Sequence, residues 1–245
     1  MRIEPMTRLL LLILLLPLGA HAASEAPLDR APIETTDTAS IQRGAQVFVN
    51  YCLNCHSAQY MRYNRLTDVG LTEQQIENNL MFAASKVGDT MTVALPAKTA
   101  AQWFGVAPPD LTVIARSRGA DWLYSYLRGF YRDDARTIGW NNTVFPNVGM
   151  PHVLWELQGQ QVLEVTEHEG AHGKERVQTL ELAQPGTMSP TEYDRLVADL
   201  VNYLVYMGEP ARAQRMQMGY GVLLGLAVLF VLVYLLKKEY WKDIH

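Results

Sequence analysis

Cysteine is scarce in this sequence of 245 residues, which contains only Cys52 and Cys55. A framework of several disulfides is therefore excluded. Basic residues are not in excess either, because 21 Lys and Arg stand against 25 Asp and Glu, for a formal net charge of −4. A chain with this balance lacks the basic surface typical of nucleic-acid-binding proteins, so we expect no nucleic-acid partner.

Charge is also missing from an apolar run near the N-terminus. Leu9 to Leu16 is unbroken, and Arg2 and Arg8 precede it. The small-x-small sequence AHA at residues 20–22 follows as a cleavage signal. The run is too short to cross a hydrocarbon core of about 30 Å. These features predict that residues 1–22 are a secretory signal peptide.

A second uncharged run lies near the C-terminus. Gly219 to Leu236 holds eighteen residues without a charge, and Lys237 and Lys238 follow directly. A membrane-spanning helix needs about 20 apolar residues. Lysines at the far end of such a helix predict that the chain ends in the cytoplasm.

These two runs predict the organisation of the chain. We expect residues 23–211 to form one periplasmic domain, residues 212–236 to form a link and a transmembrane anchor, and residues 237–245 to form a cytoplasmic tail. The protein would then cross the cell inner membrane once.

The two cysteines lie in the sequence CLNCH, in which His56 follows Cys55. A disulfide across so small a loop would constrain the unfolded chain little. A thioredoxin-like redox pair begins a helix after a strand, whereas the preceding SIQRGAQVFVNY has a helical pattern. The spacing C-x-x-C-H is typical of covalent haem attachment. We therefore expect one haem c, held by Cys52 and Cys55, with His56 as the proximal iron ligand.

A six-coordinate haem needs a second iron ligand, and methionine in that position raises the reduction potential. His168 and His172 lie in a polar, Gly-containing stretch that reads as an exposed turn, and Met61 lies too near the attachment site. Met150 is favoured by its loop, which is bracketed by two prolines that restrict the backbone. The residues alone leave Met81 and Met91 open as alternatives.

Capping patterns and hydrophobic periodicity predict a mainly helical body. The alternating stretch at residues 160–183 predicts a β-hairpin, and Gly44 would allow a second helix to cross closely. The predicted helices run from Ser40 to about Tyr51, from Thr72 to about Ala84, over 111–116 and 122–127, and from Ser189 to Gly208.

Three stretches together, RGAQVFVNYCLNCHS, APPDLTVIARSRG and GMPHVLWELQG, with the basic-ended anchor after them, resemble the cytochrome c1 family. Members of this family are the haem subunits of cytochrome bc1 (ubiquinol–cytochrome c reductase) complexes. The resemblance covers most of residues 38–242, and the MPHVLWELQG form looks like the bacterial branch. It implies a c-type cytochrome fold with the β-hairpin as an insertion.

The resemblance also implies roles for particular residues and partners. It singles out Met150 as the distal ligand and suggests that Arg118 meets a haem propionate, with Arg116 close enough to compete. The implied partners are cytochrome b, a Rieske iron–sulfur protein that donates single electrons, and a cytochrome c that accepts them. The second cysteine pair found in some relatives is missing, so no disulfide braces the loop of Met150.

Two alternatives of function stay open at this point. An anchored c-type cytochrome could relay electrons to an oxidase without the bc1 partners. A haem peroxidase would need an acid–base group beside an open iron site, and His152 is the residue that would serve it.

Overall fold

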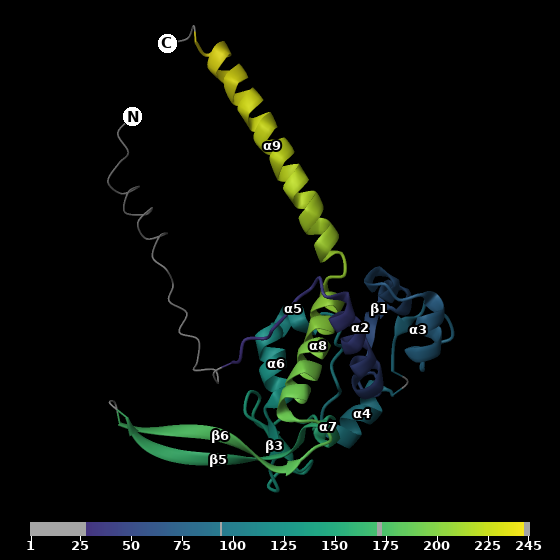
Figure 1. The fold of residues 1–245 in the computed structure, drawn as a ribbon, viewed down its shortest axis with the longest axis vertical. Coiled ribbons are helices and arrows are strands. Elements are labelled where there is room, and N and C mark those ends of the chain that lie inside the picture. The colour runs from purple at the N-terminus through teal and green to yellow at the C-terminus, as the bar shows by residue number, and fades with distance from the viewer. Residues whose placement is uncertain (1–27, 94, 171–172, 243–245) are drawn as a thin grey trace.

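The computed structural model describes residues 28–93, 95–170 and 173–242. The predicted signal peptide and the last residues of the predicted tail lie outside this range. The body is mainly helical, as predicted, and carries three two-stranded antiparallel sheets in the described residues (Figure 1). Its helices are α2 (Thr38–Val47), α3 (Glu73–Asn79), α4 (Ala97–Phe104), α5 (Ile114–Arg118), α6 (Ala120–Arg128), α7 (Trp155–Gln158) and α8 (Pro190–Gly208). Its strands are β1 (Ala58–Arg62), β2 (Thr90–Met91), β3 (Phe130–Arg132), β4 (Trp140–Asn142), β5 (Gly159–Gly170) and β6 (Gly173–Pro185).

The crossing of α2 and α8 forms the centre of the core. A Cβ at Gly44 would overlap the carbonyl oxygen of Asp199 and lie 2.7 Å from the Cβ of Tyr203. Only glycine therefore lets the two helices come this close. Beside the crossing, the Nε–H of Arg43 donates a hydrogen bond to Oδ2 of Asp199 at 2.6 Å, and the rings of Phe48 and Tyr203 lie with their centroids 5.4 Å apart. The close crossing predicted at Gly44 is present.

The start of α2 differs from the prediction. Asp37 caps the helix, and its Oδ1 accepts a hydrogen bond from the backbone of Ser40 at 2.9 Å. Ser40 is itself buried, and its hydroxyl accepts from Asn202 on α8 at 3.0 Å. The prediction that Ser40 caps the helix was wrong, because its hydroxyl bonds Asn202, which is distant in sequence.

Other helix ends follow local signals more closely. Both predicted capping boxes are formed, at Thr72 with Gln75 and at Ser189 with Glu192. The helix after Thr72 ends at Asn79 rather than near residue 84. Helix α4 and the β3–β4 pair were not predicted.

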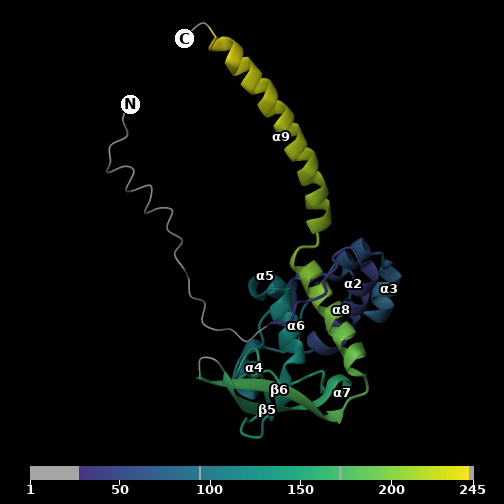
Figure 2. The same ribbon diagram turned by 60° about the vertical axis from the view of Figure 1, so that its left-hand side comes forward.

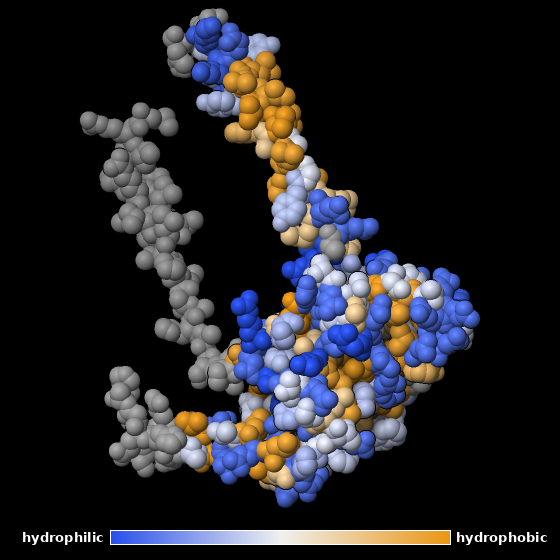
Figure 3. All heavy atoms as spheres, viewed as in Figure 1, coloured by the Kyte–Doolittle hydropathy of each residue, from blue (hydrophilic) through white to orange (hydrophobic). Residues whose placement is uncertain are grey.

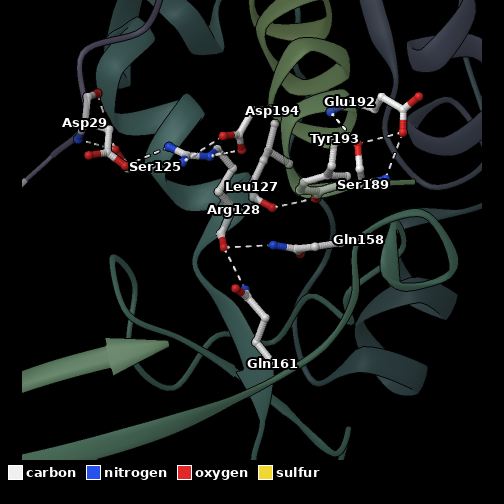
Figure 4. Close-up of polar contacts among 10 residues, drawn as sticks. All are labelled: Asp29, Ser125, Leu127, Arg128, Gln158, Gln161, Ser189, Glu192, Tyr193 and Asp194. Atoms are coloured by element: carbon white, nitrogen blue, oxygen red, sulfur yellow. Dashed lines mark hydrogen bonds and ion pairs between the residues drawn. The ribbon is translucent and has the colours of Figure 1, made fainter. Parts of the chain in front are cut away.

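Arg128, at the end of α6, ties the body together (Figure 4). Its guanidinium bonds Asp29 at 2.7 Å and Asp194 of α8 at 2.6 Å, which joins the start of the described chain to two helices. Its carbonyl accepts from the side chains of Gln158 and Gln161 at 3.1 and 2.9 Å. These bonds fix α6, which carries part of the functional site, against α8 and the root of the hairpin.

The predicted β-hairpin is formed by β5 and β6, whose register runs from Gly159 opposite Pro185 to Gly170 opposite Gly173. It extends from the end of the body that lies away from the C-terminal helix (Figures 1 and 2). Val165 and Val177 on its outer part are 52% and 44% exposed.

The C-terminal helix α9 (Arg212–Tyr240) leaves the body as a single helix. Its stretch Gln214–Tyr240 is long and apolar enough to cross a membrane, and none of it is buried against the rest of the chain. Hydrophobic residues cover much of its length, and polar residues gather at its far end (Figure 3). Most of the predicted link is part of this helix, because α9 begins at Arg212.

Candidate functional site

Cys52, Cys55 and His56 lie in a single turn that follows α2. The chain first widens into a short π-helix, η1 (Phe48–Cys52). The carbonyl oxygen of Cys52 then accepts from the backbone N–H of Cys55 at 3.1 Å and of His56 at 2.8 Å. Both thiols are free. The turn therefore presents two unpaired thiols and one imidazole together.

The imidazole of His56 is held in one orientation. Its Nδ1 lies 2.8 Å from the carbonyl oxygen of Pro109, and the side chain is 9% exposed. A carbonyl oxygen can only accept, so Nδ1 carries the proton and Nε2 keeps its lone pair. Burial lowers the pKa of His56, with the bond to Pro109 opposing it more weakly. The residue is thus a neutral donor of one nitrogen lone pair.

The segment that holds His56 is itself anchored on the motif. Asp110 accepts from the backbone of Gln59 at 2.8 Å and of Thr112 at 2.9 Å. Leu111 donates its N–H to the carbonyl of Ser57 at 2.8 Å. This explains why the APPDL stretch, distant in sequence, belongs to the same site.

The environment of Cys52 does not suit thiol redox chemistry. Burial raises the pKa of its thiol to about 12, and the neighbouring Cys55 adds to the rise. A reactive cysteine needs a lowered pKa, because the thiolate is the nucleophile. The burial of Cys52 and the raised pKa of its thiol argue against the thioredoxin-like alternative.

Met150 forms a second cluster with residues of α6. Its sulfur accepts a hydrogen bond from the hydroxyl of Tyr126 at 3.4 Å. The ring of Tyr126 stacks on Trp122 with centroids 4.7 Å apart and meets Phe130 edge-on at 5.1 Å. Met150 is half-buried, and its thioether keeps one lone pair for a further partner.

Asn142 braces the loop that leads to Met150. Its side chain is completely buried, and its Oδ1 accepts from the N–H groups of Val144 and Phe145 at 2.9 and 3.1 Å. Its Nδ2 donates to the backbone carbonyl of Tyr126 at 2.8 Å. One side chain thereby ties the loop to α6.

Asn141 supplies a second brace. Its Oδ1 accepts from the N–H of Asn147 at 2.8 Å, and its Nδ2 donates to Asp133 at 2.8 Å. Asn147 has a φ of 63°, in the left-handed region that asparagine tolerates better than most residues. Two asparagines thus secure the Met150 loop without a disulfide.

We expect Asn142→Ala to lower the free energy of unfolding by about 3 kcal/mol, because one buried and two partly buried hydrogen bonds, worth about 1 kcal/mol each, are lost. Asn79→Ala is the control, since its side chain is exposed and donates one bond, to Gln75. Denaturant unfolding of both variants checks this. An equal, small effect at both positions would mean that Asn142 does not brace the loop.

His152 packs in an aromatic core rather than facing an open site. It is 3% exposed, lies parallel to Phe130 at 4.8 Å and meets Trp140 edge-on at 5.1 Å. Burial lowers its pKa to about 4, with a weaker opposing effect from Gln158. Among the residues that the structure describes, neither the Nε2 of His152 nor the Oε1 of Gln158 makes a hydrogen bond.

The remaining ligand candidates lie in varied surroundings. The sulfur of Met91 is completely buried and accepts from the hydroxyl of Tyr203 at 3.3 Å in the core. Met61 is 2% exposed, and Met81 is partly buried. The side chain of His168 and the whole of His172 lie outside the described residues.

The structure separates Arg116 from Arg118. The stem of Arg116 packs on Gly208 at the end of α8, where a Cβ would lie 3.2 Å from its Cγ. The guanidinium of Arg118 lies over the rings of Trp122 and Phe145, at 5.1 and 5.9 Å from their centroids. Arg118 is therefore the one on the side of Met150.

The two clusters offer the donor set that a c-type haem requires. The first supplies two free thiols and a nitrogen lone pair, and the second supplies a thioether. The chain from Pro109 through α5 and α6 connects them. The sequence singled out these four residues as candidates but not Tyr126, Asn141 or Asn142, since no local pattern marks a side chain whose partners are distant.

Comparison with known proteins shows which family the chain matches. The chain matches the family model described as "Cytochrome C1 family" over residues 29–164 and 184–244. Among curated proteins, it is 54% identical over 238 residues to "Ammonia monooxygenase gamma subunit" of Nitrosomonas europaea, with 97% of both chains covered. It is 51% identical over 221 residues to "Cytochrome c1" of Allochromatium vinosum, with 89% of this chain and 90% of the relative covered.

A more distant relative is "Cytochrome c1, heme protein, mitochondrial" of Saccharomyces cerevisiae, 26% identical, with 92% of this chain and 74% of the relative covered. Between its two matched segments the family match leaves out residues 165–183, of which 165–170 and 173–183 form the outer part of the β5–β6 hairpin. Only the outer part of the hairpin thus lies outside the family match, while Cys52, Cys55, His56 and Met150 all lie within the family match.

Proposed function

Because this chain belongs to the cytochrome c1 family, we propose that it carries one covalently attached haem c and transfers single electrons within a quinol–cytochrome c reductase complex. The observation that supports this most is the turn in which two free thiols accompany an imidazole whose Nδ1 is bound to Pro109. When bound, the haem supplies the one-electron chemistry through its iron.

The residues of the chain have distinct parts in this proposal. Cys52 and Cys55 form the thioether tethers, and His56 donates its Nε2 lone pair from a fixed orientation. Met150 would supply its thioether as the second iron ligand, a soft, neutral ligand that would raise the reduction potential. Arg118 faces a haem propionate, for which a guanidinium is well suited. Burial of Cys52 and His56 keeps water away from that side of the site.

The proposed partners follow from the family and from the anchor. Helix α9 holds the haem domain on the periplasmic side of the cell inner membrane, with the C-terminus in the cytoplasm. Electrons arrive from a Rieske iron–sulfur protein and leave to a cytochrome c, with cytochrome b in the same complex.

Purification of the full-length chain from native membranes tests this assignment. Co-purification of a cytochrome b and a Rieske protein, with quinol-dependent reduction of cytochrome c, is the expected result. Isolation with a terminal oxidase instead would support the relay alternative. Rapid binding of carbon monoxide or cyanide by the native protein would support a peroxidase, which the packing of His152 disfavours.

The name of one relative, "Ammonia monooxygenase gamma subunit", favours a second candidate function, that of a subunit of a monooxygenase. The same purification separates the two, because the other subunits recovered would then be those of a monooxygenase.

A further inference from the structure

Tyr126 is bonded to the Met150 loop at both of its ends. Its backbone carbonyl accepts from the Nδ2 of Asn142 at 2.8 Å, and its hydroxyl lies 3.4 Å from the sulfur of Met150. Within the described residues, the hydroxyl has no other hydrogen-bond partner. The contact with sulfur is therefore the one for which the hydroxyl is placed.

The direction of this hydrogen bond is fixed by chemistry. A thioether carries no proton, so the hydroxyl of Tyr126 must donate. Tyr126 is buried, with 9% of its surface exposed. The parallel ring of Trp122, 11° from coplanar, and the edge contact with Phe130 stop the ring from turning away.

The bond has two consequences for the sulfur. A thioether has two lone pairs, and Tyr126 takes one, so the other is held in a defined direction. A donated hydrogen bond also draws electron density from sulfur. A sulfur that gives less electron density to the iron stabilises the oxidised iron less than before and affects the reduced iron little. The reduction potential therefore rises.

We propose that Tyr126 is a positioning residue that raises the reduction potential of the site through its hydrogen bond to Met150. The inference rests on the proposed function, since it needs Met150 as the iron ligand.

The chain provides a matched control in its second tyrosine–methionine pair. Tyr203 donates to the sulfur of Met91 at 3.3 Å, with both side chains completely buried in the α2–α8 core. Loss of either hydroxyl removes one buried hydrogen bond to sulfur. Only the loss at Tyr126 should act on the haem.

The test compares Tyr126→Phe with Tyr203→Phe in the full-length haem protein, by redox titration and by the near-infrared sulfur-to-iron charge-transfer band. In Tyr126→Phe, we expect the ratio of reduced to oxidised haem at a fixed potential to fall about two- to tenfold, as for one hydrogen bond. The wavelength of the charge-transfer band should also shift. Tyr203→Phe should change neither, although it costs similar stability.

Fluorotyrosine at position 126 keeps the ring and makes a stronger donor, so it should shift the ratio in the opposite direction. It also serves if Tyr126→Phe fails to fold. A charge-transfer band that is present in the unmodified protein and unchanged by both replacements, with an unchanged ratio, would overturn the inference alone. Absence of that band from the unmodified protein would overturn the ligation of iron by Met150, and the inference with it.

Discussion

Met150→Leu is expected to lower the reduction potential by on the order of a hundred millivolts or more, within the range of about 0.8 V that axial ligands span. Leucine has nearly the volume of methionine, so the loop should stay packed while the sulfur ligand is lost. Quinol-dependent reduction of cytochrome c should fall to background, because the iron would no longer be oxidising enough to take the electron. Redox titration and steady-state turnover measure the two effects.

Met91→Leu is the control for this prediction. It makes the same replacement at a sulfur that is completely buried and bonded to Tyr203. Its potential should equal that of the unmodified protein. An unchanged potential in Met150→Leu, together with a fall in Met91→Leu or Met81→Leu, would move the ligand assignment to the other methionine.

Gly44→Ala is expected to destabilise the body by about 3 kcal/mol, the upper part of the range for overpacking a core. The new methyl group would meet the backbone of Asp199 and the Cβ of Tyr203, and neither can turn aside. Helix propensity alone predicts the opposite sign, because alanine stabilises a helix by about 1 kcal/mol relative to glycine. The sign of the change in denaturant unfolding therefore decides whether α2 and α8 cross here.

The same substitution should reduce haem attachment, because α2 runs through η1 directly into Cys52. Gly221→Ala is the control, since Gly221 lies in helix α9, where its Cβ position meets nothing from other parts of the described chain within 4 Å. It should leave both the unfolding of the body and the amount of covalent haem unchanged. A stabilised Gly44→Ala variant would contradict the observed crossing.

Features carried by neighbouring residues were predicted well from the sequence. The two capping boxes involve residues three apart, and both form as expected. The hairpin was visible because its alternation is local to residues 160–183, and β5 and β6 pair across that range. Gly44 was a correct guess about packing, because a glycine inside a helical pattern has few other uses.

Features that depend on distant partners were missed. Ser40 resembles a helix cap, but Asn202 takes its hydroxyl and Asp37 caps the helix instead. Asn141 and Asn142 carry no periodic signal, and their role depends on how the loop folds back on α6. Tyr126 looks like any core aromatic until its hydroxyl is found beside Met150.

An optical redox titration of the purified full-length protein tests the central claim most directly. We expect a c-type spectrum from one covalently attached haem and a single one-electron transition at a high potential, as His56 and Met150 ligation requires. A c-type spectrum with a low potential would contradict methionine ligation and would indicate a histidine or an open distal position. Absence of covalent haem from a host that matures other c-type cytochromes would contradict the account of Cys52 and Cys55.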